Sequence, residues 1–229
     1  MLELFLEKAV SVMLLAASLL KGGVDAAMPD KDVAGTFFLV SRSQLISEDY
    51  APEVRKVNLP GLSQSMRADA ADALEALFAA AKADGVRLST VSGYRSFSKQ
   101  NTLYDRKVRN AGTATANSLV AQPGSSEHQL GLAMDISTSG SSSLNGRFAE
   151  TSEGQWVAEN AHLYGFIVRY PLGMEDVTGY SYEPWHLRYV GKAFAEAVYE
   201  SGLPLDLYVS YHRAEVYNYL VHHTNEVLP

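Results

Sequence analysis

The sequence predicts an α+β fold organised as a single catalytic-sized domain. The chain has 229 residues, which is enough to bury one substantial core without help from a partner. Hydrophobic residues make up 47% and charged residues 20%, a composition typical of a globular protein. Helical and strand-like segments are mixed along the chain without a repeated βαβ period, which favours α+β over a parallel α/β sheet.

The clearest helix signal covers residues 66–84, where Leu74, Leu77 and Phe78 recur at helical spacing and Gly85 provides a stop. The other elements follow from β-prone runs, polar helical patterns and breakers. In chain order they are a strand at 36–40, a strand at 86–92, a polar helix at 98–110, a loop at 113–124, a strand at 133–136, a flexible excursion at 137–146, a helix at 153–163, a strand at 165–170, a strand at 187–190 and a helix at 192–200.

Residues 1–30 are predicted to be an apolar leader, either a signal peptide or an anchor. Within them, residues 9–20 are apolar apart from two serines. As a helix this run would rise only about 18 Å, which is short for a membrane span and typical of the core of a signal peptide. Glu3 and Glu7 stand where a signal peptide carries positive charge, so an ordinary docking helix stays open as an alternative.

The remaining chain divides into a domain at 31–203 and a tyrosine-rich carboxyl-terminal extension at 204–229. Tyr208, Tyr211, Tyr217 and Tyr219 fit a helix that packs onto the domain.

Charge and cysteine content exclude several functions. The formal net charge of −7 argues against a nucleic-acid binder. The chain has no cysteine, which excludes disulfides, cysteine nucleophiles and thiolate metal sites. Any bound metal must therefore be held by imidazole and carboxylate groups.

Two clusters of such groups stand out, at residues 125–135 and 183–186. His128, Asp135 and His186 would give a zinc ion three protein ligands and leave one position for water. Glu183, three residues before His186, could then act on that water as a general base. Each cluster alone is weak evidence, because a His–Asp pair is often a capping interaction and Glu-Pro-Trp-His can be a simple turn. Their joint occurrence favours a metal site.

A third segment, residues 92–96, ends the strand predicted at 86–92 and carries Arg95. An arginine held at a strand end is suited to gripping a substrate carboxylate or the oxyanion that develops on an attacked carbonyl. An ion-paired surface arginine is the alternative interpretation.

Residues 92–96, 126–135 and 183–186 together resemble the signature of the VanY-type zinc D-alanyl-D-alanine carboxypeptidases, which share a fold with the dipeptidase VanX and the hedgehog signalling domain. The resemblance covers about residues 37–202. It implies a small, mainly antiparallel sheet flanked by helices and one Zn²⁺ per chain. The implied roles are zinc ligands at His128, Asp135 and His186, a catalytic base at Glu183, stabilisation of the substrate carbonyl or carboxylate by Arg95, and substrate contacts at Ser126, Gln100 and Trp185.

The resemblance also implies an activity, the removal of terminal D-alanine from peptidoglycan stem or precursor peptides. An L,D-carboxypeptidase, a D,D-dipeptidase or a peptidoglycan endopeptidase could use the same zinc chemistry. A non-catalytic peptidoglycan-binding module is a further alternative, although it would have no use for Glu183. We expect the protein to be exported or membrane-anchored through its leader and to face the bacterial cell wall, with a cytoplasmic location as the alternative.

Overall fold

A four-stranded antiparallel sheet is the frame of the structure, a computed structural model that describes residues 33–213. The strands are arranged in the order β3-β4-β6-β5, and each neighbouring pair is antiparallel. Their bounds are Leu88–Ser92 for β3, Ala133–Thr138 for β4, Phe166–Tyr170 for β5 and Glu183–Tyr189 for β6. A separate short pair joins β1 (Arg55–Lys56) to β2 (Ser65–Met66). The predicted α+β class and antiparallel sheet are confirmed.

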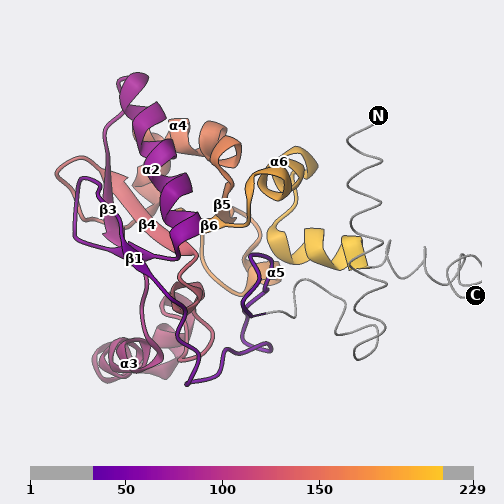
Figure 1. The fold of residues 1–229 in the computed structure, drawn as a ribbon. Coiled ribbons are helices and arrows are strands. Elements are labelled where there is room, and N and C mark those ends of the chain that lie inside the picture. Colours follow the sequence, from indigo (N-terminus) through magenta and orange to yellow (C-terminus); the bar gives the residue numbers. More distant parts are fainter. Residues whose placement is uncertain (1–32, 214–229) are drawn as a thin grey trace, which may run out of the picture. The chain divides into compact units, whose positions relative to one another are not determined.

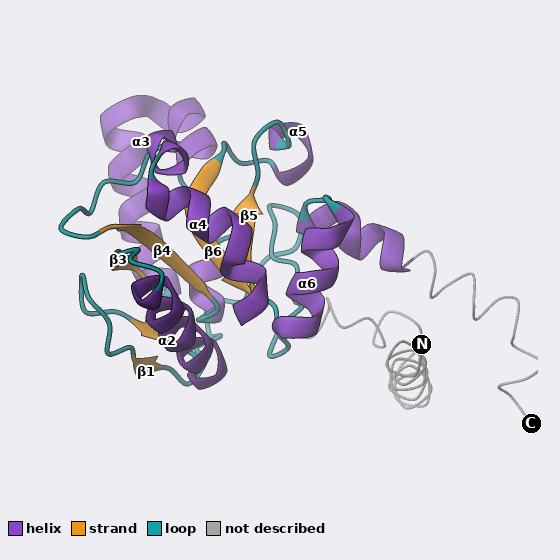
Figure 2. Cartoon of the chain, turned by 90° about the horizontal axis from the view of Figure 1, so that it is seen from above, coloured by secondary structure: helices purple, strands orange, loops and turns teal. Residues whose placement is uncertain are grey.

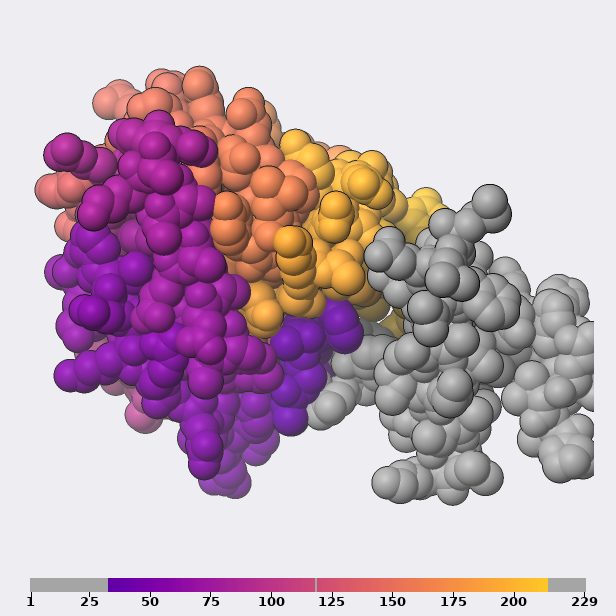
Figure 3. Space-filling view, turned by 45° about the horizontal axis from the view of Figure 1, so that its top comes forward, coloured from indigo at the N-terminus to yellow at the C-terminus, as the bar shows by residue number. Residues whose placement is uncertain are grey.

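The helices lie on opposite sides of this sheet. Figure 1 shows α2 (Ala68–Ala83) and α4 (Ser152–Asn160) on one side and α3 (Phe97–Leu119) on the other. The view from above in Figure 2 agrees, with α4 crossing in front of the strands and α3 lying behind. In the space-filling view, the purple α2 region lies directly beside the orange region around α4 and β5 (Figure 3). Two further helices, α5 (Glu175–Thr178) and α6 (Lys192–Ser201), flank β6 in the sequence.

The two central strands have one apolar face and one polar face. Successive side chains of a strand point to opposite faces, so Met134 and Ile136 of β4 lie on the face opposite to Asp135. Met134, Ile136 and Leu187 of β6 are fully buried, and α4 contacts both β4 and β6. The apolar face is therefore the core, and the polar face, with Asp135 and His186, is left for chemistry.

Most predicted elements are confirmed within a few residues, and three differ. No strand forms at residues 36–40, which make turns and irregular chain. The helix predicted to end at 110 continues as α3 to Leu119, so the predicted loop at 113–124 is wrong over its first half. Gly112 interrupts the helical geometry with a φ of 79°, and this glycine is why the sequence predicts an end of the helix near residue 110. The helix resumes after it, because Ala114 and Ala116 are good helix formers.

The third difference concerns residues 183–186, which are the first part of β6 rather than a turn before it. Pro184 has no N–H to donate, and the sequence pattern therefore indicates a break. The ladder between β5 and β6 is irregular between Val168 and Tyr170, opposite this position. Strands tolerate proline at such irregularities.

The ends of the chain bear on the predicted leader and extension. The leader at 1–30 lies outside the described residues. Within residues 33–213, no helix combines the length and apolarity needed to cross a bilayer. One compact unit covers residues 40–208 and includes the buried Leu205 and the ion-paired Asp206, from the start of the predicted extension.

Gly131 provides a test of the local geometry that leads into β4. It ends the 3₁₀ turn Glu127–Leu130 with a φ of 70°, and an added Cβ would lie 3.1 Å from Val54 Cγ1. We expect Gly131→Ala to lower the free energy of unfolding by about 1–2 kcal/mol, because a side chain is strained in this left-handed conformation. Urea unfolding measures the change.

The matched control is Gly146→Ala, since Gly146 has no positive φ and its added Cβ would meet nothing within 4 Å. We expect it to change stability by less than about 0.5 kcal/mol. Equal losses in the two variants would contradict the account of this turn.

Candidate metal centre and active site

Strand pairing brings two of the predicted metal ligands together. Asp135 of β4 and His186 of β6 are direct partners in the antiparallel register, so their side chains lie side by side on the polar face. His128 comes from the 3₁₀ turn just before β4. All three side chains are buried, and the ligand atoms they offer lie within 4.8 Å of one another.

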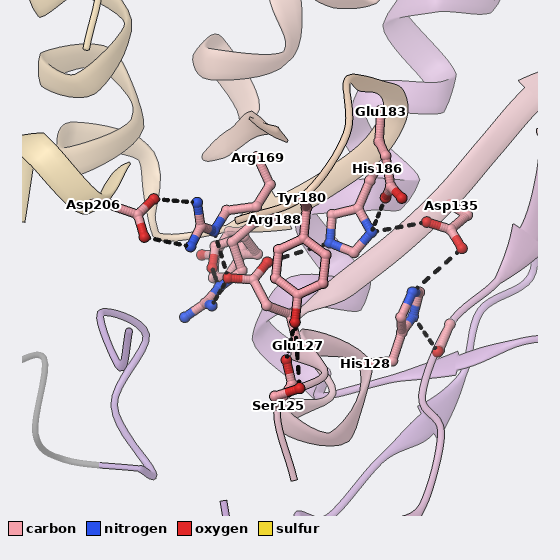
Figure 4. A network of polar contacts seen from close by, with 12 residues as sticks. Ser125, Glu127, His128, Asp135, Arg169, Tyr180, Glu183, His186, Arg188 and Asp206 are labelled. Carbon is pink, nitrogen blue, oxygen red and sulfur yellow. Dashed lines mark hydrogen bonds and ion pairs between the residues drawn. The ribbon is translucent and has the colours of Figure 1, made fainter. Parts of the chain in front are cut away.

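Each imidazole has one nitrogen next to the Asp135 carboxylate and the other next to a second oxygen atom, from Gly93 or Glu127 (Figure 4). For His128, Nδ1 lies 2.8 Å from the Gly93 carbonyl oxygen and Nε2 lies 3.3 Å from Asp135 Oδ2. For His186, Nδ1 lies 3.0 Å from Asp135 Oδ1 and Nε2 lies 3.3 Å from Glu127 Oε2. Hydrogen bonds of this kind on the outer nitrogen set the tautomer and orient the ring of a metal-binding histidine.

The electrostatics of this group favour a cation. Burial lowers the pKa of His128 and also acts to lower that of His186, but hydrogen bonds to Asp135 and Glu127 raise the pKa of His186 to about 10. Burial acts to raise the pKa of Asp135, yet the two imidazoles hold it below its ordinary value. Positive charge is thus stabilised between Asp135 and His186. Two imidazole nitrogens and one carboxylate oxygen fit a zinc ion, which would take the place of that proton.

Glu183 begins β6 and faces the same group. Its Oε2 lies 3.8 Å from His186 Nδ1, and its side chain is 21% exposed. Burial raises the pKa of Glu183 to about 7, although His186 acts to lower it. A carboxyl group with such a pKa can both accept and release a proton near neutral pH.

Arg95 is held in place by several hydrogen bonds. Its Nη1 donates to Gln100 Oε1 at 2.8 Å, and its Nη2 donates to Ser92 Oγ at 2.7 Å. Gln100 is fully buried, and its Nε2 donates to the Ala121 carbonyl at 2.6 Å. Gln100, which the resemblance implies as a peptide contact, is therefore a buried hydrogen-bond partner of Arg95 in this structure.

A cavity of about 490 Å³ joins these groups. The three predicted ligands, Glu183 and Arg95 all line it, and so do two of the expected substrate contacts, Ser126 and Trp185. Ser126 is buried and Trp185 is half-buried. Of the predicted site residues, Gln100 alone is absent from the lining.

Three charged residues next to the predicted ligands have no role in the sequence-based prediction. They are Glu127, Arg169 and Arg188, and each is at most 1% exposed. Sequence signals point to two of them, Glu127 and Arg188. Glu127 lies inside the 125–135 cluster, and Arg188 follows His186 by two residues, which puts both on the same face of β6.

A buried His/Asp/His group beside a carboxyl group of raised pKa, with two of its members on the central strands of an antiparallel sheet, is typical of mononuclear metallohydrolases. Comparisons with known proteins narrow this class. The family model for VanY, D-alanyl-D-alanine carboxypeptidase, matches residues 63–192. The chain therefore belongs to the VanY family, as the sequence resemblance indicated.

Individual relatives agree. YodJ of Bacillus subtilis is 51% identical over 144 residues, which cover 62% of this chain and 53% of YodJ, so the chain spans about half the length of that relative. The structure of the LdcB LD-carboxypeptidase is 41% identical with a TM-score of 0.73, covering 79% of this chain and 87% of LdcB. A Zn(II) complex of a mutant of the D,D-pentapeptidase VanY from a VanB-type resistance cassette is 37% identical with a TM-score of 0.67, covering 76% and 98%.

Asp135 tests the proposed ligand group directly. Asp135→Asn keeps the shape of the side chain but removes the charge between the two imidazoles. We expect zinc affinity to fall about 100-fold or more, beyond the range typical of residues outside the ligand shell. Competition with a chromophoric chelator measures the affinity.

His162→Phe is the matched control. His162 stacks on Tyr199 with ring centroids 3.7 Å apart, its buried Nδ1 has no hydrogen-bond partner, and it lies outside the ligand group. Phenylalanine keeps the stacking, so zinc affinity should not change. Unchanged zinc affinity in Asp135→Asn would rule this group out as the metal centre.

Proposed function

We propose that the protein is a zinc-dependent D-alanyl-D-alanine carboxypeptidase that removes the terminal D-alanine from peptidoglycan stem or precursor peptides. One observation carries this proposal: Glu183 and Arg95 line the same cavity as the buried His128, Asp135 and His186. The site thus combines metal ligands, a proton acceptor and a fixed cation within reach of one bound peptide end.

Arg95 is suited to hold that end. Each of its Nη atoms uses one N–H on Gln100 or Ser92, which fixes the plane of the guanidinium. The remaining N–H groups can donate to the terminal carboxylate or to the oxygen of the scissile carbonyl. Ser126 and Trp185 line the cavity and can contact the peptide on either side of this anchor.

The role of Glu183 in hydrolysis is to move a proton while the oxygen of a water molecule bonds to the carbonyl carbon. When bound, zinc polarises the carbonyl and lowers the pKa of a water molecule towards about 7. The Glu183 carboxylate accepts a proton from the attacking water and then delivers it to the leaving amine nitrogen as the C–N bond breaks. The products are free D-alanine and a peptide shortened by one residue. No side chain forms a bond to the substrate.

A second candidate is an L,D-carboxypeptidase, which the similarity to LdcB favours specifically. The VanY enzyme of the zinc complex, by contrast, is named as a D,D-pentapeptidase. The same zinc chemistry would also serve a D,D-dipeptidase or an endopeptidase. A binding module without catalysis is disfavoured, because Glu183 would have no function there.

As part of this proposal, the protein is exported or membrane-anchored through its leader at residues 1–30. It would then face the cell wall, where mature stem peptides are found. Action on precursor peptides in the cytoplasm is the alternative.

Glu183→Gln tests the proposed mechanism. We expect the variant to bind zinc like the unchanged protein and to lose a factor of about 10²–10⁴ in kcat, because the amide cannot accept the proton. Release of D-alanine from a stem pentapeptide measures the turnover, and Glu175→Gln, at an exposed position, is the control.

The products identify the bond. Mass spectrometry after incubation with pentapeptide, tetrapeptide and D-Ala-D-Ala dipeptide should show loss of one D-alanine from the pentapeptide. Cleavage of the tetrapeptide alone would replace the first candidate by the second. Full activity in Glu183→Gln would refute the mechanism for both.

A further inference from the structure

A buried network of charged side chains lies directly behind His186 and takes no part in the mechanism above. Glu127, Arg169 and Arg188 are its inner members, and their side chains are at most 1% exposed. Figure 4 shows these residues gathered on the side of His186 that faces away from Asp135. Burying charges is costly, and such pairs seldom add much stability over an apolar core, so stability alone does not account for this network.

The two oxygens of Glu127 are used differently. Oε1 accepts hydrogen bonds from Arg169 Nε at 2.8 Å and from Arg188 Nη1 at 2.7 Å. Oε2 lies 3.3 Å from Nε2 of His186. Both arginines therefore fix one oxygen of the carboxylate, and the other oxygen is left to accept the imidazole proton.

We propose that Glu127 is a positioning residue for the metal centre, which holds the proton of His186 on Nε2 so that the lone pair of Nδ1 is directed at the metal. The inference rests on the proposed zinc function and extends it. It follows from the placement of the atoms, since Nδ1 lies on Asp135 and Nε2 on Glu127. Free rotation of the ring would exchange the two nitrogens and remove one ligand from the group.

The network continues to Asp206, beyond the residues that match the family model. Arg169 donates to both Asp206 oxygens, from Nη1 at 2.6 Å and from Nη2 at 3.2 Å. The network thus holds two guanidinium groups and two carboxylates, and Asp206 supplies the second negative charge. Arg169 donates to both Glu127 and Asp206. Asp206 therefore holds Arg169 in place, and Arg169 in turn holds the Glu127 carboxylate.

The alternative is that the network only stabilises the fold. The two roles differ in what they predict, because a stabilising ion pair changes the unfolding equilibrium and leaves the affinity of the folded protein for metal untouched. A positioning residue changes the metal affinity and the ligand geometry of the folded protein.

The experiment uses the full chain with Glu127→Gln and Asp206→Asn. We expect Glu127→Gln to weaken zinc binding by roughly 10–100-fold in a chelator competition, the effect typical of residues that orient a ligand. Asp206→Asn changes a side chain that is 15% exposed and that reaches His186 only through Arg169 and Glu127, so it should weaken zinc binding by a smaller factor. The visible absorption of the Co(II)-loaded protein should shift in Glu127→Gln, because the ligand geometry changes.

Glu75→Gln is the matched control. Glu75 pairs with Arg55 in a half-exposed ion pair of the same chemistry, outside the metal group. Its zinc affinity and Co(II) spectrum should equal those of the unchanged protein.

Unchanged zinc affinity and an unchanged Co(II) spectrum in folded Glu127→Gln, with only a lower melting temperature, would overturn the inference. If Glu127→Gln does not fold, Asp206→Asn decides, and unchanged zinc affinity in that variant overturns it equally. Failure of the proposed function looks different, since the unchanged protein would then bind zinc and cleave no stem peptide.

Discussion

Asp135 and His186 lie opposite each other on the two central strands, and this pairing fixes where the other functional groups can act. On the other side of Asp135, its partner on β3 is Ser92, whose hydroxyl accepts a hydrogen bond from Arg95. Glu183 begins the same strand as His186. A slip of one residue would turn Asp135 towards the core and Met134 into the site. The apolar face under α4 therefore protects the register on which the metal group depends.

Charge balance sets the second constraint, because the site buries both acids and bases. Asp135 lies between two imidazoles, and Glu127 lies between His186 and two arginines. The Asp135 carboxylate keeps a depressed pKa in spite of burial, and Glu183, with less compensation, has its pKa raised. The same polar face thus carries an ionised Asp135 and a Glu183 able to exchange a proton, because the two carboxyl groups have different neighbours.

Much of this arrangement could be predicted from the sequence. The predicted ligands, the predicted base and Arg95 stand in compact clusters whose residue types suit that chemistry, and the helix at 68–83 has a regular apolar repeat. Four features could not be predicted. Gly112 and Pro184 imitate breaks that tertiary packing overrides. The role of Gln100 behind Arg95 depends on side-chain direction, and the link from Asp206 to His186 joins residues whose sequence separation hides any pattern.

Anomalous diffraction at the zinc absorption edge, from crystals of the zinc-loaded chain, would locate the metal ion and identify its ligand atoms. We expect one zinc ion per chain, bound by Nε2 of His128, a carboxylate oxygen of Asp135 and Nδ1 of His186, with Nε2 of His186 hydrogen-bonded to Glu127. A zinc ion bound elsewhere, or coordination of His186 through Nε2, would contradict it.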